Sequence, residues 1–124
     1  MLLHGIDICP VERVARMLAE HGESFTSRCF TAGEIAHCEK DKRRDEHYAA
    51  RFAAKEAVLK ALGTGWSGGI AWTDVEVVTE QNGAPRVALH GKAADEALRR
   101  GVRSWTISLS HAGGMAIASA IAEV

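Results

Sequence analysis

Residues 45 to 62 read DEHYAARFAAKEAVLKAL, which is the strongest helix signal in the chain. The segment is rich in Ala, Glu, Lys and Leu, and it contains neither Gly nor Pro. Gly63 follows at the position where a left-handed residue commonly ends a helix. An apolar stripe recurs at helical spacing along the segment, formed by Ala49, Phe52, Ala53, Leu59 and Gly63. We therefore expect a helix over residues 45–62 that packs this stripe against a core.

Strand-like and helical segments lie on both sides of this helix. Strands are predicted over residues 2–8, 70–78, 85–89, 104–110 and 115–121, with turns at Asn82-Gly83 and Gly113-Gly114. Shorter helices are predicted from Pro10 to a stop at Gly22, from Ala32 behind a capping box of Thr31 and Glu34, and over residues 92–100. Residues 25–30 read as a turn or short helical piece, and residues 40–46 as a solvated loop or helix end. This order predicts an α+β fold, with a mainly antiparallel sheet packed with the long helix.

Composition narrows the class of protein. The 124 residues, of which 47% are apolar and 25% charged, fit one globular domain over residues 1–124. A net charge of −1 gives no general signal for nucleic-acid binding. No apolar run reaches the ~18 residues of a membrane span, and no secretory leader pattern opens the chain, so we expect a cytoplasmic protein without a membrane partner. The three cysteines form no C-x-x-C pair, which argues against disulfides and a zinc site.

Glu56 is the first residue whose chemistry calls for an explanation. It lies four residues after Phe52 and three before Leu59, so its side chain is expected on the inward face of the helix. An inward carboxylate is costly unless it is paired or binds a metal. Lys60, one turn further on, borders the same face, and the pattern alone favours a Glu56–Lys60 helix pair near the surface over a metal ligand.

Asp7 is the second such residue, because Asp is depleted in strands and Asp7 lies at the end of the predicted strand of residues 2–8, just before a helix. One interpretation is that Asp7 caps the helix that follows. The other is that Asp7 and Glu56 together supply two hard oxygens for Mg²⁺, an ion that often takes only one or two protein carboxylates.

Two further segments suit phosphate binding. Lys60-Ala-Leu-Gly63-Thr-Gly65 combines a lysine with a glycine-rich turn, as in a phosphate cradle, although helix termination explains Gly63 as well. The order of a P-loop is absent. His111 ends the run Ser108-Leu-Ser110-His111, where it is either a packed or surface residue or a group for phosphate contact and acid–base chemistry.

These residues belong to longer motifs that resemble a known family. The motifs are Gly5-Ile-Asp7-Ile, Arg13, Phe30-Thr-x-x-Glu34, RFAAKEAVLKALGTG from Arg51 to Gly65, Trp72-x-Asp74-Val-Glu76-Val, Asn82-Gly83-x-Pro85 and Ser108-x-Ser110-His111. In this order they resemble the 4′-phosphopantetheinyl transferases across nearly the whole chain, and the long-helix block is highly specific. The length is similar to that of the short, single-module branch of the holo-acyl-carrier-protein synthase type.

The resemblance implies an activity and a set of site residues. Members of the family use Mg²⁺ to transfer 4′-phosphopantetheine from coenzyme A to a serine of an apo carrier protein, releasing adenosine 3′,5′-bisphosphate. By motif position, Asp7 and Glu56 are the implied metal ligands and Lys60 the implied contact of the coenzyme phosphates, and these three are the implied catalytic residues. The other positions that match the coenzyme site are Arg51, Lys55, Gly63, Thr64 and His111.

The resemblance also implies partners. Arg13 matches a basic residue that faces the carrier protein, and Arg16, on the same outward helix face, and Arg28 extend the expected docking patch. The short branch typically forms homotrimers with an active site at each subunit interface. The implied pathway is fatty acid biosynthesis, although carriers of polyketide and peptide synthesis also offer a serine.

The chemistry of the reaction agrees with these residues. The pyrophosphate of coenzyme A carries negative charge that a cation and a lysine must hold. The serine hydroxyl must attack the β-phosphorus in line, with a metal-oriented water or Glu56 as proton acceptor and Glu34 less favoured, since capping explains it. Two other hypotheses are a different Mg²⁺-dependent nucleotide phosphotransferase or hydrolase using the same carboxylates, and a silent carrier-binding module. The presence of Asp7, Glu56 and Lys60 disfavours the silent module.

Overall fold

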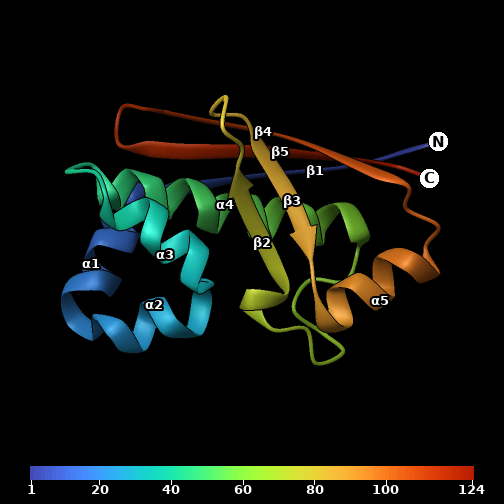
Figure 1. Ribbon diagram of the computed structural model, residues 1–124, viewed down its shortest axis with the longest axis horizontal. Helices are drawn as coiled ribbons and strands as arrows, with labels where there is room; N and C mark the ends of the chain where they lie inside the picture. The colour runs from blue at the N-terminus through green and yellow to red at the C-terminus, as the bar shows by residue number, and fades with distance from the viewer.

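A computed structural model describes residues 1–124. Its elements in chain order are β1 (Leu2–Pro10), α1 (Val11–His21), α2 (Glu23–Cys29), α3 (Ala32–Glu39), α4 (Arg44–Leu62), the 3₁₀ turn η1 (Trp72–Asp74), β2 (Val75–Thr79), β3 (Pro85–Leu89), α5 (Gly91–Arg99), β4 (Ser104–Ala112) and β5 (Met115–Glu123). In Figure 1 the three long strands run together along one edge of the molecule, and α4 lies beside them. Helices α1, α2 and α3 gather at one end of α4, and α5 lies toward the other end.

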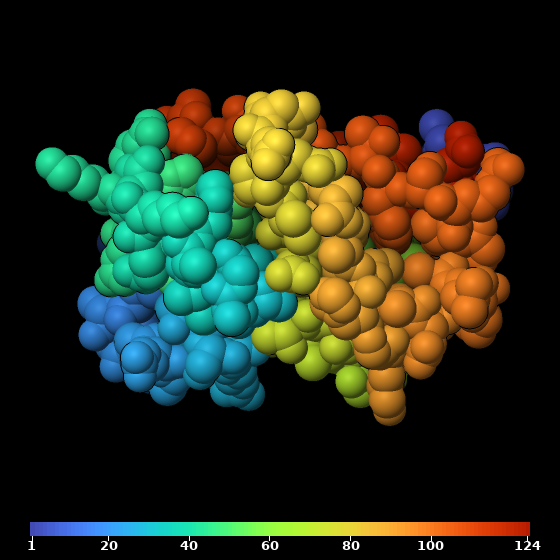
Figure 2. All heavy atoms as spheres, viewed as in Figure 1, coloured from blue at the N-terminus to red at the C-terminus, as the bar shows by residue number.

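The strands form two antiparallel sheets. One has the order β1-β5-β4, and the other is the hairpin of β2 and β3. In the larger sheet β5 pairs along its whole length with β1 and with β4, so that Leu2 and Ser104 both lie opposite Glu123. The prediction of an α+β fold with antiparallel strands is confirmed. The space-filling view shows the hairpin, in yellow, between α3 and the segment of α5 and β4 (Figure 2).

The long helix was predicted almost to the residue. It begins at Arg44 and ends at Leu62, and Gly63 takes the left-handed conformation with φ 76°, its N–H bonded to the carbonyls of Leu59 and Lys60. The prediction that Glu56 faces inward is wrong. Sheet, hairpin and neighbouring helices bury α4 around most of its circumference, and Phe52 and Glu56 are half-buried and Lys60 exposed along the side that remains open.

Strand β1 and helix α4 touch backbone to backbone. A Cβ atom on Gly5 would lie 1.9 Å from the carbonyl oxygen of Ala57 and 2.7 Å from the nitrogen of Ala61, so no side chain fits at Gly5. Because strand residues alternate between two faces, Asp7 lies on the same α4-facing side as Gly5 and Cys9. The contact therefore fixes Asp7 beside the turn of α4 that carries Glu56 and Lys60.

Alanine fills much of the space between the sheet and α4. The inner side of β5 is formed by four fully buried alanines, Ala116, Ala118, Ala120 and Ala122. Helix α4, which packs against β1 and β5, adds six more buried alanines, Ala49, Ala50, Ala53, Ala54, Ala57 and Ala61. Small side chains on both surfaces allow this close approach of helix and sheet.

Several boundaries differ from the sequence prediction. The strand expected over residues 70–78 starts only at Val75, because η1 precedes it: the Asp74 carboxylate accepts a hydrogen bond from the backbone N–H of Ala71 at 3.1 Å and closes a turn. Residues 25–29 are helical within α2, Phe30 is its extended C-cap residue, and β4 and β5 each extend two residues beyond their predicted ends. The capping box of Thr31 and Glu34 is confirmed. None of the helices combines the length and apolar character needed to span a membrane.

Candidate active site

Asp7 and Lys60 meet where β1 crosses α4. The Lys60 Nζ lies 2.9 Å from Asp7 Oδ1 and also donates to the Ile6 carbonyl at 3.1 Å. The Asp7 side chain is 19% exposed and the Lys60 side chain 54% exposed, so the pair faces solvent. Asp7 does not cap a helix, because β1 continues to Pro10, which is the N-cap residue of α1 and makes no side-chain bond. The capping interpretation of Asp7 is therefore wrong.

Glu56 lies on the same open side of α4 but pairs with neither lysine. Its Oε1 accepts a hydrogen bond of 3.3 Å from the indole N–H of Trp66, and the predicted Glu56–Lys60 pair is absent because Lys60 turns to Asp7. Each carboxylate thus has one oxygen engaged by a protein donor. The other oxygen, Oδ2 of Asp7 and Oε2 of Glu56, has no protein donor.

Cys9 lies two residues after Asp7 on the same side of β1 and is buried. Burial raises the pKa of Cys9, Arg13 opposes this, and the negative charges of Asp7 and Glu56 raise it further. Asp7 is paired with Lys60, and Glu56 precedes Lys60 by one helical turn on the same open side of α4, so both carboxylates lie at the crossing of β1 and α4. Two carboxylates from different elements and a lysine converge there, and the structure contains no cluster of three or more metal-ligating side chains.

An aromatic wall borders this point. The rings of Trp66 and Trp72 lie 3.8 Å apart between centroids, and Trp72 stacks on Phe52 at 4.5 Å. The guanidinium of Arg13 lies 5.8 Å from the centroid of Phe52. Sequence reasoning missed Trp66, which belongs to none of the motifs and follows Gly65 in a loop without periodicity.

A hollow of 290 Å³ opens between α1, α2 and this wall. Arg13 and Arg28 line it together with the apolar side chains of Met17, Phe25, Phe52 and Trp72. Arg16 is not part of the hollow; it is largely exposed and pairs with Glu12 at 3.3 Å. Of the three arginines of the expected docking patch, the structure therefore brings two together at one cavity.

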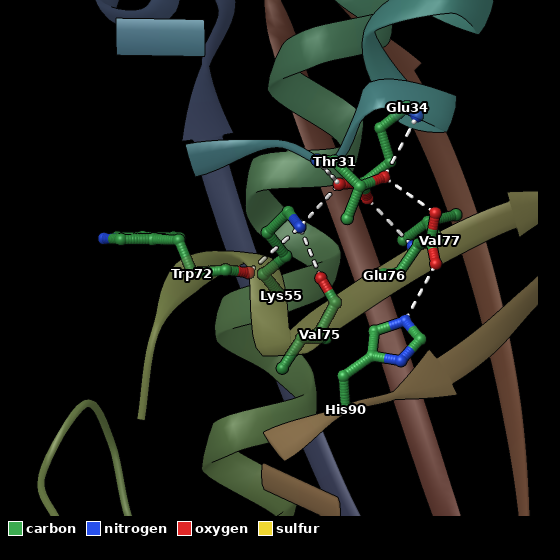
Figure 3. A network of polar contacts seen from close by, with 8 residues as sticks. All are labelled: Thr31, Glu34, Lys55, Trp72, Val75, Glu76, Val77 and His90. Atoms are coloured by element: carbon green, nitrogen blue, oxygen red, sulfur yellow. Dashed lines mark hydrogen bonds and ion pairs between the residues drawn. The ribbon is translucent and has the colours of Figure 1, made fainter. Parts of the chain in front are cut away.

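The expectation that Lys55 lines the coenzyme site is not met. Its side chain is 0% exposed, and its Nζ lies 2.7 Å from Glu34 Oε1 and donates to the carbonyls of Trp72, at 3.1 Å, and Val75 (Figure 3). Burial lowers the pKa of Lys55, while the charge of Glu34 opposes that shift. Through its three acceptors the buried Lys55 ammonium holds α4 to α3 and to the start of β2. It has no exposed surface with which to contact coenzyme A.

Glu34, which is also fully buried, uses both of its carboxylate oxygens in the same hydrogen-bond network. Glu34 accepts from Thr31 N at 2.9 Å and from Val77 N at 2.8 Å in addition to Lys55, as Figure 3 shows. Glu76 extends the network, since it accepts from Thr31 Oγ1 at 2.7 Å and lies 2.9 Å from His90 Nε2. Glu34 is therefore a structural group, and the structure removes it as a candidate proton acceptor.

Arg51 and His111 line a second hollow, of 420 Å³, with His37, His47 and Thr79. Arg51 is 4% exposed; its Nη2 donates to Thr79 Oγ1 at 2.8 Å, and its Nε has no partner. Residues 51 and 56 lie about 140° apart around a helix of 3.6 residues per turn, so this cationic hollow and Glu56 are on different sides of α4. Within one chain the structure does not bring Arg51 and His111 to Asp7 and Glu56.

Gly63 and Thr64 follow Lys60 at the end of α4. Gly63 is exposed, and Thr64 donates through its hydroxyl to the carbonyl of Gly65 at 2.9 Å. The loop that they begin carries Trp66 back onto Trp72. They lie on the Lys60 side of the molecule, apart from the hollow of Arg51.

This chain is similar to proteins of one known family over nearly its whole length. The family described as the 4′-phosphopantetheinyl transferase superfamily matches residues 4–118. Holo-acyl-carrier-protein synthases of Solibacter usitatus and Koribacter versatilis are 43% and 45% identical over 119 residues, covering 96% of this chain and 95% of each relative. Among solved structures, the holo-acyl-carrier-protein synthase of Helicobacter pylori in complex with coenzyme A has a TM-score of 0.86 at 29% identity, covering 98% of this chain and 100% of that one. The corresponding synthase of Neisseria meningitidis has a TM-score of 0.89 at 26% identity, with 98% of both chains covered.

Proposed function

Because this chain belongs to the 4′-phosphopantetheinyl transferase superfamily, we propose that residues 1–124 form one transferase domain that moves 4′-phosphopantetheine from coenzyme A to a serine of an apo acyl carrier protein. The observation that carries the proposal is the Asp7–Lys60 pair at the crossing of β1 and α4, with Glu56 one helical turn before Lys60 on the same open side of α4. Two carboxylates and one lysine suit a diphosphate donor, since its charge needs a cation and a positive side chain.

The two carboxylates fit Mg²⁺. Each offers a hard oxygen that no protein donor occupies, and they come from a strand and a helix whose spacing the Gly5 contact fixes. Mg²⁺ commonly uses one or two carboxylates and completes its coordination with water and phosphate oxygens. We therefore assign Asp7 and Glu56 to hold the ion, which when bound neutralises charge on the diphosphate and on the leaving bisphosphate.

Lys60, which pairs with Asp7 in the structure, is also assigned to bind the diphosphate of coenzyme A. It is half-exposed, and its ammonium carries three donors on a flexible stem. With coenzyme A present, Lys60 contacts a phosphate oxygen of the diphosphate, and Gly63 and Thr64 border the same phosphates from the end of α4.

The transfer exchanges one P–O bond for another. The carrier serine oxygen bonds to the β-phosphorus, and the bond to the adenosine 3′,5′-bisphosphate breaks in line with it. The hydroxyl proton leaves toward Glu56, directly or through a water, because Glu34 is buried and engaged by Lys55. In this proposal Glu56 holds the ion and also receives the serine proton.

The hollow between α1 and α2 suits the carrier protein. Carrier proteins of this kind are acidic around the modified serine, and Arg13 and Arg28 offer charge next to apolar contact surface. The hollow also adjoins the aromatic wall beside Glu56, so a carrier bound there presents its serine near the diphosphate. Arg16 contributes at the rim, where charge acts mainly on the rate of association.

We also propose that the protein forms a homotrimer. The outer face of the β1-β5-β4 sheet exposes large apolar side chains, namely Leu2, Ile6, Ile8 and Ile117. A second copy of the chain covering this face would bury them. We propose that a neighbouring subunit also supplies its Arg51 and His111 hollow to the site of Asp7 and Glu56. Assembly would thus complete a coenzyme site whose two halves lie on different sides of one subunit. Light scattering that finds a fully active monomer at working concentration would contradict this assembly.

Incubation of an apo acyl carrier protein with coenzyme A, Mg²⁺ and this protein tests the proposed reaction. Mass spectrometry should show the carrier gaining one phosphopantetheine. Cleavage of coenzyme A without labelling of the carrier would instead indicate a hydrolase. Acceptance of fatty-acid carriers over polyketide and peptide-synthetase carriers in the same assay would place the reaction in fatty acid biosynthesis, and we assign it to the cytoplasm, where coenzyme A and these carriers meet.

A further inference from the structure

Trp66 lies in an unusual loop at the edge of the active site. Residues 63–69 contain four glycines with positive φ, namely Gly63, Gly65, Gly68 and Gly69. Trp66 is the one large side chain in this run, and it does not project into solvent with its neighbours. Its ring lies on Trp72, and its indole N–H points to Glu56.

The orientation of Glu56 depends on this tryptophan. Glu56 receives no other hydrogen bond, and Lys60, which could pair with it one helical turn away, is turned to Asp7. Glu56 is also half-buried on the open side of α4, where packing alone does not hold a flexible carboxylate. Trp66 engages Oε1 and leaves Oε2 without a donor.

The tryptophan is itself held in place from behind. Trp72 supports one face of its ring, and the carbonyl of Trp72 accepts from the buried Lys55 at 3.1 Å. Phe52 stacks on Trp72 from α4 at 4.5 Å. A rigid wall therefore carries the N–H donor, although the loop around it is rich in glycine.

We propose that Trp66 is a positioning residue for the divalent cation: its N–H fixes the Glu56 carboxylate so that Oε2 faces the ion. The proposal rests on the assignment of Asp7 and Glu56 to Mg²⁺. Hydrogen bonds to a ligating carboxylate typically set its orientation, and their loss costs roughly 10- to 100-fold in metal affinity or activity. Trp66 acts through Glu56 and touches neither the serine nor the phosphates.

Trp66→Phe tests the donor, because phenylalanine keeps a ring on Trp72 and lacks the N–H. The probe is Mn²⁺, whose free concentration is followed by electron paramagnetic resonance in the presence of saturating coenzyme A. We expect the Kd of Mn²⁺ to rise roughly 10- to 100-fold. Excess Mg²⁺ should restore kcat, and the KM for coenzyme A at saturating metal should stay near the wild-type value.

Trp105→Phe is the matched control, since Trp105 lies in β4 beside a different hollow, lined by Val87, Leu98 and Arg103. It should bind Mn²⁺ as the wild type does. Replacement of Trp66 by 3-benzothienylalanine, which exchanges the N–H for sulfur and keeps both rings, should weaken Mn²⁺ binding as Trp66→Phe does. This second variant separates loss of the donor from loss of the stack.

The outcomes distinguish this inference from the proposed function. Wild-type Mn²⁺ affinity in both Trp66 variants, with carrier labelling intact, would overturn the role of Trp66 and leave the transferase standing. Failure of the wild type itself to bind Mn²⁺, with Glu56→Gln fully active, would overturn the metal assignment and the inference together. Weaker Mn²⁺ binding in both Trp66 variants and not in Trp105→Phe supports the proposal.

Discussion

Lys55 and Glu56 are neighbours in the chain, yet α4 turns their side chains into two different environments. Lys55 lies in a dry network with the Glu34 carboxylate and two backbone carbonyls, where all of its donors are used. Glu56 is half-buried with one engaged oxygen, beside the solvent-facing pair of Asp7 and Lys60. Both sides of the helix therefore carry charge, but only the side with unengaged carboxylate oxygens can bind a ligand.

The largest expected effect is a loss of folding stability when the buried Lys55 is replaced, compared with replacement of the exposed Lys60. Lys55→Met should lower the free energy of unfolding by about 3–5 kcal/mol, because the Glu34 carboxylate stays buried without its partner. Lys60→Met is the matched control and should change it by less than about 1 kcal/mol, as expected for an exposed pair. Urea denaturation of both variants measures the difference. Equal losses would mean that the two lysines do not differ in the way their burial indicates.

The next largest expected effect is a loss of transfer activity when the carboxylates Asp7 and Glu56, on the open side of α4, are neutralised. Asp7→Asn and Glu56→Gln should each lower transfer by more than roughly 100-fold, beyond the loss typical of a group that only orients a ligand. The amides keep the shape and lose the charge that holds Mg²⁺. Steady-state transfer with circular dichroism as a check of folding measures this, and Glu80→Gln, on the distant hairpin, should be active. Turnover at the wild-type rate in both variants would remove the metal assignment, and unfolding of both would make the carboxylates structural.

Replacement of Lys60 should change coenzyme A binding and the transfer rate less than replacement of the two carboxylates changes transfer. Lys60→Ala should weaken coenzyme A binding by about tenfold, which corresponds to roughly 1.4 kcal/mol, and should slow transfer. Lys60→Arg keeps the charge and should lose less. Calorimetry with coenzyme A measures the affinity. If affinity and rate are both unchanged in Lys60→Ala, the lysine is an ordinary residue of the helix surface.

The smallest expected effect lies at the carrier surface, where two arginines of α1 can be compared directly. Arg13→Glu should raise the KM for the apo carrier about fivefold and leave that for coenzyme A unchanged, as loss of one surface charge pair is worth up to ~1 kcal/mol. Arg16→Glu makes the same charge change away from the hollow and should do less. The defect should shrink with added salt, over a Debye length of ~8 Å at physiological ionic strength. An unchanged carrier KM in the Arg13→Glu, Arg16→Glu double variant at low salt would show that the carrier docks elsewhere.

Local sequence signals predicted the framework well. The helix of residues 45–62, its cap at Gly63, the capping box at Thr31 and the strands were found from composition, periodicity and turn residues, with shifts of a few residues. These features depend on neighbours in the chain, which a single sequence displays.

Features that depend on distant contacts were harder to predict. Glu56 was placed inward because its spacing matches Phe52 and Leu59, but α4 is covered nearly all round and its open side is the one with Glu56. Lys55 was assigned to the coenzyme by motif position, while its partner Glu34 lies 21 residues earlier. No sequence pattern indicated that the Trp66 loop returns to Glu56. The roles of Arg51, Gly63, Thr64 and His111 toward coenzyme A stay predictions.

The alanines between β5 and α4 have a consequence for how this chain tolerates mutation. Where large side chains fill a core, the damaging substitutions are those that shorten a residue and leave a cavity. Here most of the contact surface consists of methyl groups with no exposed area, so little volume can be lost at these positions. Added methylenes would instead force the helix away from the sheet. Saturation mutagenesis of Ala118 and Ala120 should therefore accept Gly or Ser more readily than Val or Leu, and the enlarged variants should also disturb the distance between Asp7 and Glu56.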